Sequence, residues 1–301
     1  MEIKSFTNEV IAEINNKISL SKQNIIGYCY GMLFFGKSFN SKSISFFTKN
    51  HFKCEIYCYL IKKIFNLICW EDKIISPKAD PSYLAKIMEP ESKKTILSFF
   101  GYKDNFENIN KSFLKKEGEI NAFIAGAFIA CGSITSPQKG YRVEFTIKNE
   151  KKANEFIFLL KKNELPFKLT VRNGDNVIYS NDSSVVEDLL TFIGAQNSSM
   201  EIMEVKIVKN LRNSINRKTN CEMANINKTI SAAEKQINAI KKIENSKGLE
   251  FLSEDLREIC YLRLENPEMS LKELGENLSK NISRSGVNHR IEKLLKIADE
   301  I

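Results

Sequence analysis

The chain has 301 residues, a formal net charge of +8 and 43% hydrophobic residues, enough for two or three domains with real cores. The excess of Lys and Arg is compatible with a polyanionic partner and equally with a lysine-rich proteome, so charge alone does not identify a partner. The N-terminus lacks the apolar region of a signal peptide, and the seven cysteines follow no disulfide framework. These features argue against a secreted protein, and we expect a cytoplasmic chain with reduced thiols that does not bind membranes.

The first hundred residues predict an alternation of helices and strands. Residues 5–20 have the spacing of a short amphipathic helix that Ser5 or Thr7 can cap, and an apolar helix follows to about Ser38. The other elements expected here are a strand over 43–49, a helix over 51–67, strands near 73–76 and 83–87, and a helix from about Glu91.

The second hundred residues repeat this order more clearly. The expected elements are a strand over 141–148, a helix over 151–163, strands over 167–172 and 176–180, and a helix over 183–193. Asn173-Gly174-Asp175 is a strong hairpin signal between the last two strands. The strand-to-helix stretches that begin near Thr48 and Ile147 match at an offset of 99 residues. This internal repeat predicts two related αβ units.

Each repeat begins with an apolar helix that contains glycine. Residues 121–136 read NAFIAGAFIACGSITS, and residues 28–38 read YCYGMLFFGKS. A glycine costs a helix roughly 1 kcal/mol relative to alanine, so Gly126 and Gly132 need a structural reason. We expect close helix–helix contact, with the two apolar helices packed across a pseudo-twofold axis.

Residues 124–132, IAGAFIACG, resemble the LAGLIDADG motif of homing endonucleases, in which two such helices join αββαββα half-domains. The resemblance implies an acidic metal ligand immediately before the last glycine. That position holds Cys131 in the second copy and Phe35 in the first. A hard divalent cation prefers oxygen ligands, so we expect the nuclease scaffold without its catalytic acids.

Residues 199–243 differ in character, being rich in Asn and in helix-forming residues. We expect mostly helix, with loops or helix ends at Asn210, Asn213, Asn216, Asn220, Asn225 and Asn227. Between residues 205 and 221 the segment carries five basic residues and no acid. Candidate contacts to a DNA backbone are Lys206, Lys209, Arg212, Arg217 and Lys218, although a solvated helix face explains them equally well.

The last fifty residues predict three short helices. Ser253 can cap a helix over 254–264, Ser270 and Glu273 form a capping box for a helix over 271–278, and Ser283 can cap a helix over 284–298. This arrangement fits a helix-turn-helix, in which the start of the last helix faces the DNA major groove. The candidate DNA-binding residues are Ser270, Lys272, Ser283, Arg284, Ser285, Asn288, His289, Arg290 and Lys293.

Three features together resemble the WhiA family of bacterial transcription regulators: the two degenerate LAGLIDADG copies, the block RNSINR at 212–217 and the stretch SRSGVNHR at 283–290. The resemblance implies an α+β fold, with a duplicated αββαββα LAGLIDADG-like domain followed by an all-α helix-turn-helix domain. The expected domains are 1–195 (halves about 1–103 and 104–195), a basic helical linker over 196–247, and a helix-turn-helix over 248–301.

The resemblance further implies a non-catalytic, sequence-specific regulator of cell division or chromosome segregation and, in spore-formers, of sporulation. Its expected partner is double-stranded promoter DNA on the nucleoid, with RNA polymerase or another transcription factor as a further candidate. No cofactor is expected.

Four other interpretations compete with this one. The rival function is a metal-dependent endonuclease with acids relocated to Glu117, Glu119 or Glu144, and a third function is a protein-interaction platform. Residues 31–38 match the phosphate-binding pattern GxxxxGK[ST], but bulky apolar residues in that turn argue against a nucleotide site. His51, Cys54 and Cys58 share a helical face that suits either a partial metal site or a core. With no fourth ligand evident, we expected a core.

Overall fold

The computed structural model describes residues 5–20, 24–76, 79–103 and 106–301. The chain divides into two compact units, residues 1–209 and 210–301. The elements of the first half of unit 1 are α1 (Phe6–Leu20), α2 (Ile25–Phe34), β1 (Ser38–Phe39), β2 (Ile44–Thr48), α3 (His51–Phe65), β3 (Trp70–Ser76), β4 (Ala79–Lys86) and α4 (Pro90–Phe99).

The second half of unit 1 follows the same order from α5 onward. A short 3-10 helix, η1 (Lys111–Phe113), precedes α5 (Glu117–Cys131), β5 (Gly132–Ile134), β6 (Val143–Ile147), α6 (Glu150–Lys162), β7 (Lys168–Arg172), β8 (Asp175–Ser180) and α7 (Ser183–Phe192). From α2 and from α5 alike the order is αββαββα, which confirms the expected duplicated α+β fold.

Two four-stranded antiparallel sheets carry the repeat. Their strand orders are β1-β2-β4-β3 and β5-β6-β8-β7. The registers also correspond, because Ser45 faces Lys86 in the first sheet and Glu144, 99 residues after Ser45, faces Tyr179 in the second. Apolar residues from the sheets and from the helices form one continuous core in unit 1.

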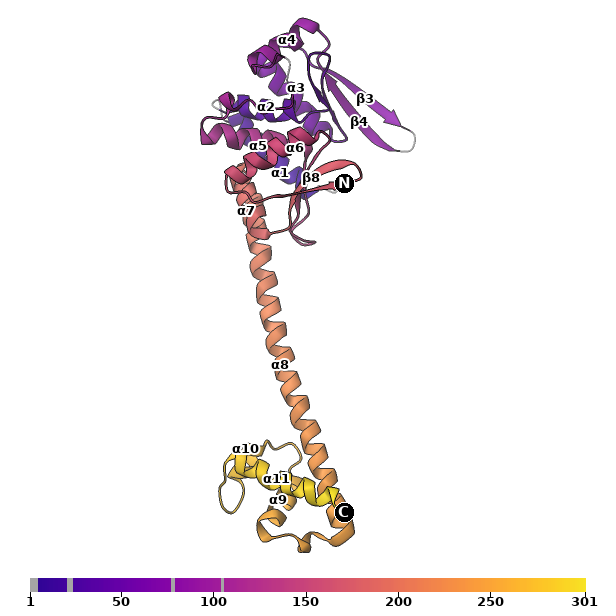
Figure 1. Ribbon diagram of the computed structural model, residues 1–301, viewed down its shortest axis with the longest axis vertical. Helices are drawn as coiled ribbons and strands as arrows, with labels where there is room; N and C mark the ends of the chain where they lie inside the picture. Colours follow the sequence, from indigo (N-terminus) through magenta and orange to yellow (C-terminus); the bar gives the residue numbers. More distant parts are fainter. Residues whose placement is uncertain (1–4, 21–23, 77–78, 104–105) are drawn as a thin grey trace. The chain divides into compact units, whose positions relative to one another are not determined.

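Helices α2 and α5 pack against each other in the centre of unit 1 (Figure 1). A Cβ atom on Gly31 would lie 2.2 Å from the carbonyl oxygen of Phe123, and one on Gly126 would lie 2.3 Å from that of Tyr28. Only glycine therefore allows these backbones to approach so closely. This confirms the helix-packing interpretation and excludes a phosphate-binding turn at Gly31, which lies inside a buried helix.

Gly132 has a different role from the one expected. It ends α5 and begins β5 with an extended backbone, and a Cβ atom there would meet Phe128 of its own helix. Gly132 therefore turns the chain from helix to strand, whereas Gly126 makes the helix–helix contact.

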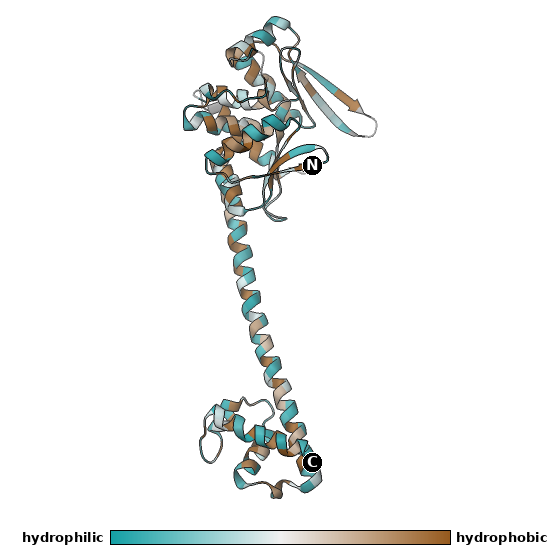
Figure 2. Cartoon of the chain, viewed as in Figure 1, coloured by the Kyte–Doolittle hydropathy of each residue, from teal (hydrophilic) through white to brown (hydrophobic). Residues whose placement is uncertain are grey.

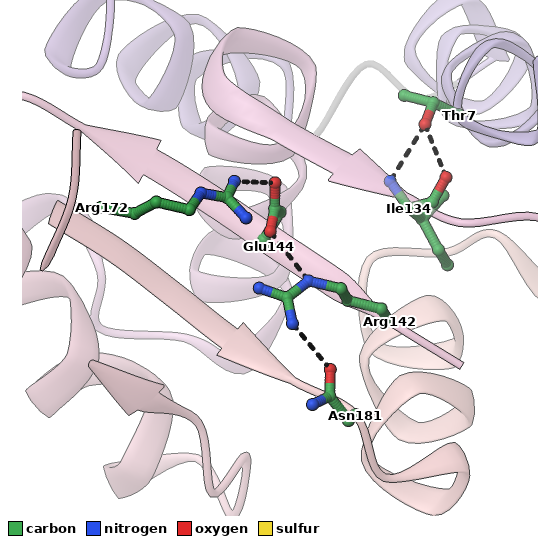
Figure 3. A network of polar contacts seen from close by, with 6 residues as sticks. All are labelled: Thr7, Ile134, Arg142, Glu144, Arg172 and Asn181. Atoms are coloured by element: carbon green, nitrogen blue, oxygen red, sulfur yellow. Dashed lines mark hydrogen bonds and ion pairs between the residues drawn. The ribbon is translucent and has the colours of Figure 1, made fainter. Parts of the chain in front are cut away.

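The N-terminal helix α1 is tied to the second sheet. The Thr7 hydroxyl donates to the carbonyl of Ile134 over 2.9 Å and accepts from its amide over 3.0 Å, as Figure 3 shows. The Thr7 side chain thereby provides hydrogen-bond partners for both the N–H and the C=O group of Ile134, at the end of β5.

Helix α8 (Gln196–Lys247) is continuous, so the expectation of loops or helix ends at its asparagines is wrong. These side chains are exposed, and Figure 2 shows hydrophilic and hydrophobic residues mixed along the helix. Each asparagine costs only a fraction of a kcal/mol in a helix, and a long helix tolerates such costs because its propagation is cooperative.

Unit 2 contains α8 from Asn210 onward, the 3-10 helix η2 (Leu249–Phe251), α9 (Glu254–Glu265), α10 (Leu271–Glu276) and α11 (Arg284–Asp299). Its separate core joins Ile240 and Ile243 of α8 to apolar residues of the three short helices. The described part of the chain contains no helix that is both long and apolar enough to span a bilayer.

Candidate nucleic-acid interface

Helix α11 begins at a well-formed cap. The Ser283 hydroxyl accepts the amide hydrogen of Gly286 over 3.3 Å and exchanges a 2.8 Å hydrogen bond with Ser285. The helix buries one face in the unit 2 core, through Val287, Ile291, Leu294 and Ala298. The opposite face is therefore fixed towards solvent.

The predicted base-reading residues are exposed at the start of α11. These residues are Arg284, Ser285, Asn288 and His289, and Lys293 is exposed one turn later. Guanidinium, amide and imidazole groups on one helix end offer the donors and acceptors that can pair with base edges in a major groove.

Besides Ser285, the predicted residues Asn288 and Arg290 also have side-chain partners. The Asn288 amide donates to Glu292 over 2.8 Å, and the Arg290 guanidinium lies 3.4 Å from the Asp255 carboxylate, with only 19% of its side chain exposed. Arg290 thus joins α11 to α9. Asn288 must leave Glu292 to contact a base.

Helix α10 is capped by side chains at its start, and its Gly275 lies close to the backbone just before α11. Ser270 and Glu273 cap α10 reciprocally, because the Ser270 amide donates to the Glu273 carboxylate and the Ser270 hydroxyl accepts the Glu273 amide. A Cβ atom on Gly275 would lie 2.3 Å from the Ile282 carbonyl, so only glycine allows the turn to pass here. Lys272 is exposed and lies 3.7 Å from Glu276.

The buried Arg263 fixes the preceding turn. Its guanidinium donates to the carbonyls of Met269, Pro267 and Asn266, over 2.6, 3.3 and 3.5 Å. Burial lowers its pKa below the usual value. The role of Arg263 was not predictable from the sequence, since nothing in its spacing distinguishes it from a surface arginine.

The predicted backbone contacts on α8 fall into two groups. In unit 1, Lys206 pairs with Glu187 over 3.0 Å, and Lys209 donates to the Pro137 carbonyl over 2.6 Å and lies over the Tyr141 ring. In unit 2, Arg212, Arg217 and Lys218 are exposed. The second group therefore has guanidinium and ammonium groups in solvent.

The ends of α2 and α5 carry the two positions at which the LAGLIDADG resemblance implies an acidic residue. Cys131 is half-buried, its thiol donates to the Ala127 carbonyl over 3.3 Å, and burial raises its pKa to about 12 although Lys53 opposes this. The Phe35 ring packs against Phe34, Phe123 and Phe156. Neither position offers an oxygen ligand.

A lysine lies beside each helix end, Lys53 by Cys131 of α5 and Lys152 by Phe34 of α2. Lys152, 99 residues after Lys53, donates to the Phe34 carbonyl over 2.7 Å and lines a cavity of about 1060 Å³, together with Cys131 and Phe35. Burial lowers the pKa values of both lysines to about 8, although Cys131 opposes this for Lys53 and Glu107 for Lys152. Ammonium groups at these places repel a divalent cation.

Of the three acids considered for a relocated active site, Glu144 and Glu119 make structural contacts. Burial raises the pKa of Glu144, but Arg172 and Arg142, at 2.8 and 3.0 Å, outweigh it and hold the pKa below its usual range (Figure 3). Glu119 accepts the backbone amides of Lys115 and Lys116 at the start of α5. Glu117 lies on the same first turn, at the opposite end of α5 from Cys131.

Comparison with known families agrees with both units. Residues 120–212 match the WhiA LAGLIDADG-like domain, and residues 215–298 match the WhiA C-terminal HTH domain. Probable cell division proteins WhiA from Clostridium botulinum (strain Eklund 17B / Type B) and Clostridium beijerinckii are 33% and 34% identical, each over 99% of this chain and 98% of the relative. The chain belongs to the WhiA family.

Solved WhiA structures share the fold. Full-length DUF199/WhiA from Thermatoga maritima is 24% identical with a TM-score of 0.58, over 99% of this chain and 98% of that one. The N-terminal LAGLIDADG domain of DUF199/WhiA is 14% identical with a TM-score of 0.50, over 64% of this chain and 93% of that one. These likenesses confirm the LAGLIDADG-like α+β unit followed by a helical C-terminal unit.

Proposed function

We propose that this WhiA-family chain is a sequence-specific DNA-binding transcription regulator that acts in cell division, and in sporulation where the host forms spores. The observation that carries the proposal is the start of α11. Arg284, Asn288 and His289 are exposed there on a helix whose other face is buried and whose N-terminus is capped. Such a helix can enter a major groove without rearranging unit 2.

Within this proposal the residues divide by task. Arg284, Ser285, Asn288 and His289 read bases, while Lys293, Lys272 and the capped N-termini at Ser270 and Ser283 hold phosphates. Arg212, Arg217 and Lys218 add contacts to the DNA backbone. Lys206, Lys209 and Arg290 contribute less, because each already has an intramolecular partner.

Binding to DNA before and after a single substitution tests this assignment. We expect Arg284→Ala to bind its best site about 1–3 kcal/mol more weakly while its affinity for random DNA changes little. Lys241→Ala, which removes an exposed positive charge from α8, is the matched control. Fluorescence anisotropy at fixed salt would show both affinities, and unchanged specificity in Arg284→Ala would contradict the assignment.

We further propose that the LAGLIDADG-like unit binds DNA or a partner protein without cleaving DNA, polymerase and another transcription factor being the candidate partners. The absence of oxygen ligands at Cys131 and Phe35 and the adjacent lysines support this proposal. Supercoiled plasmid incubated with the protein and Mg²⁺ should stay intact. Nicking that a chelator abolishes would instead support the endonuclease.

A further inference from the structure

Three thiols and a carboxylate gather where α3 meets β3. Cys54 and Cys58 lie one turn apart on α3, while Cys69 precedes β3 and Glu71 lies in it. One ligand atom from each of Cys54, Cys58 and Glu71 lies within 4.8 Å of the other two. Cys58 and Cys69 line the same small cavity, which places the third thiol beside this group. Tetrahedral zinc holds such ligands roughly 3.5–3.8 Å apart, so small side-chain rotations would close the set.

The surroundings of the cluster suit a metal that enters from solvent and is then held. Cys54 is buried, Cys58 and Cys69 are half-buried, and 30% of the Glu71 side chain is exposed. His51 Nε2 lies 2.8 Å from Glu71 Oε1, so the imidazole can orient the carboxylate. Carboxylates that ligate a metal are commonly held in one orientation by such a hydrogen bond.

The second repeat shows what this place holds when no ligand is needed. The offset of 99 residues along the helices and the shared sheet register identify the equivalent positions. Cys54, Cys58, Cys69 and Glu71 correspond to Ala153, Ile157, Phe167 and Leu169. The second repeat therefore holds apolar side chains at all four positions, with Ala153 and Phe167 buried and Leu169 exposed, whereas the first repeat holds four groups that can ligate a metal.

We propose that Cys54, Cys58, Cys69 and Glu71 bind one zinc ion, with His51 holding Glu71 in position. Thiolates are soft ligands that favour zinc over Mg²⁺ or Ca²⁺, and a set of three thiolates and one carboxylate fills a closed tetrahedral site. The ion would join α3 to the β3–β4 hairpin of the first sheet. Because the ligands come together only in the folded chain, binding would stabilise unit 1. This revises the apolar interpretation of His51, Cys54 and Cys58.

Metal analysis of the full-length, reduced protein tests the proposal. Zinc is removed with a chelator, the protein is titrated with Zn²⁺, and bound metal is counted by mass spectrometry after dialysis. We expect one zinc per chain, and none in the Cys54→Ser/Cys58→Ser double variant. Cys221→Ser, which removes an exposed cysteine of α8, should keep the zinc and is the matched control. Less than one zinc per chain in the wild type, or an unchanged count in the double variant, would overturn the proposal.

Two further measurements keep the test valid if the double variant fails to fold. Co²⁺ bound to the wild type should give the thiolate-to-cobalt absorption and visible bands of a tetrahedral site, and octahedral bands would contradict the assignment. His51→Ala, in which all four ligands remain, should weaken zinc binding about 10- to 100-fold. A wild type that contains a Cys58–Cys69 disulfide, and that takes up no zinc once reduced, would show that the thiols serve another purpose.

Discussion

A single methyl group has no room at the contact between α2 and α5. At Gly126 a Cβ atom would meet the backbone of Tyr28, which cannot move away as the end of a flexible side chain can. We expect Gly126→Ala to lower the free energy of unfolding by about 3 kcal/mol or more, at the upper end of overpacking costs. Urea unfolding measures this, with Gly140→Ala as control because nothing lies near Gly140. Equal stability of the two variants would show that the helices can separate slightly.

The ionisation of Lys152 gives the stability a pH dependence of known sign. Burial lowers the pKa of Lys152 from 10.5 to about 8 in the folded chain. Between these values the unfolded chain keeps a proton that the folded chain has released, so the contribution of Lys152 to stability rises with pH. Below pH 8 the burial of the charged group opposes folding in full.

The expected result is a difference between two proteins. The free energy of unfolding of the wild type relative to Lys152→Met should increase from pH 7.5 to pH 10, because only the wild type loses a buried charge. Chemical unfolding at both pH values gives this difference. If it does not change, the Lys152 ammonium is better solvated than its contact with Phe34 indicates.

At the scale of single elements, the capping box at Ser270 and Glu273 stabilises the start of α10. Removing the Ser270 hydroxyl leaves the Glu273 amide without its acceptor, so Ser270→Ala should cost about 1 kcal/mol. Ser253 occupies the same capping position on α9 but makes no side-chain hydrogen bond there, so Ser253→Ala should cost much less. Thermal unfolding measures the stability of both variants. Equal losses of stability would contradict the capping explanation.

Elements with a strong local signal were predictable from sequence, and elements defined by long-range pairing were not. The alternation that predicted β6 and the capping box at Ser270 and Glu273 were both confirmed. The short strands β1 and β5 escaped notice because two or three residues carry no periodicity. The thiol cluster escaped for a related reason, since Glu71 meets Cys54 only once β3 returns to α3.

At the scale of the whole molecule, each unit has its own core, and the proposed recognition residues belong to unit 2. DNA binding should weaken with salt, because each neutralised phosphate makes the slope of log affinity against log salt concentration more negative by about 0.9. Lys293→Ala should make this slope less negative by about 1 and weaken binding to all sequences alike. Salt titrations of specific and random DNA test this. A loss confined to the specific site would instead make Lys293 a base-reading residue.

Genome-wide crosslinking with DNA recovery tests the central claim most directly, that the start of α11 reads sequence. The intact protein is compared with a variant that carries alanine at Arg284, Asn288 and His289, and with Lys241→Ala at equal cellular levels. We expect sharp promoter peaks for the intact protein and the control and their loss in the triple variant. Peaks that persist unchanged in the triple variant would place recognition elsewhere, in the LAGLIDADG-like unit or in a partner protein.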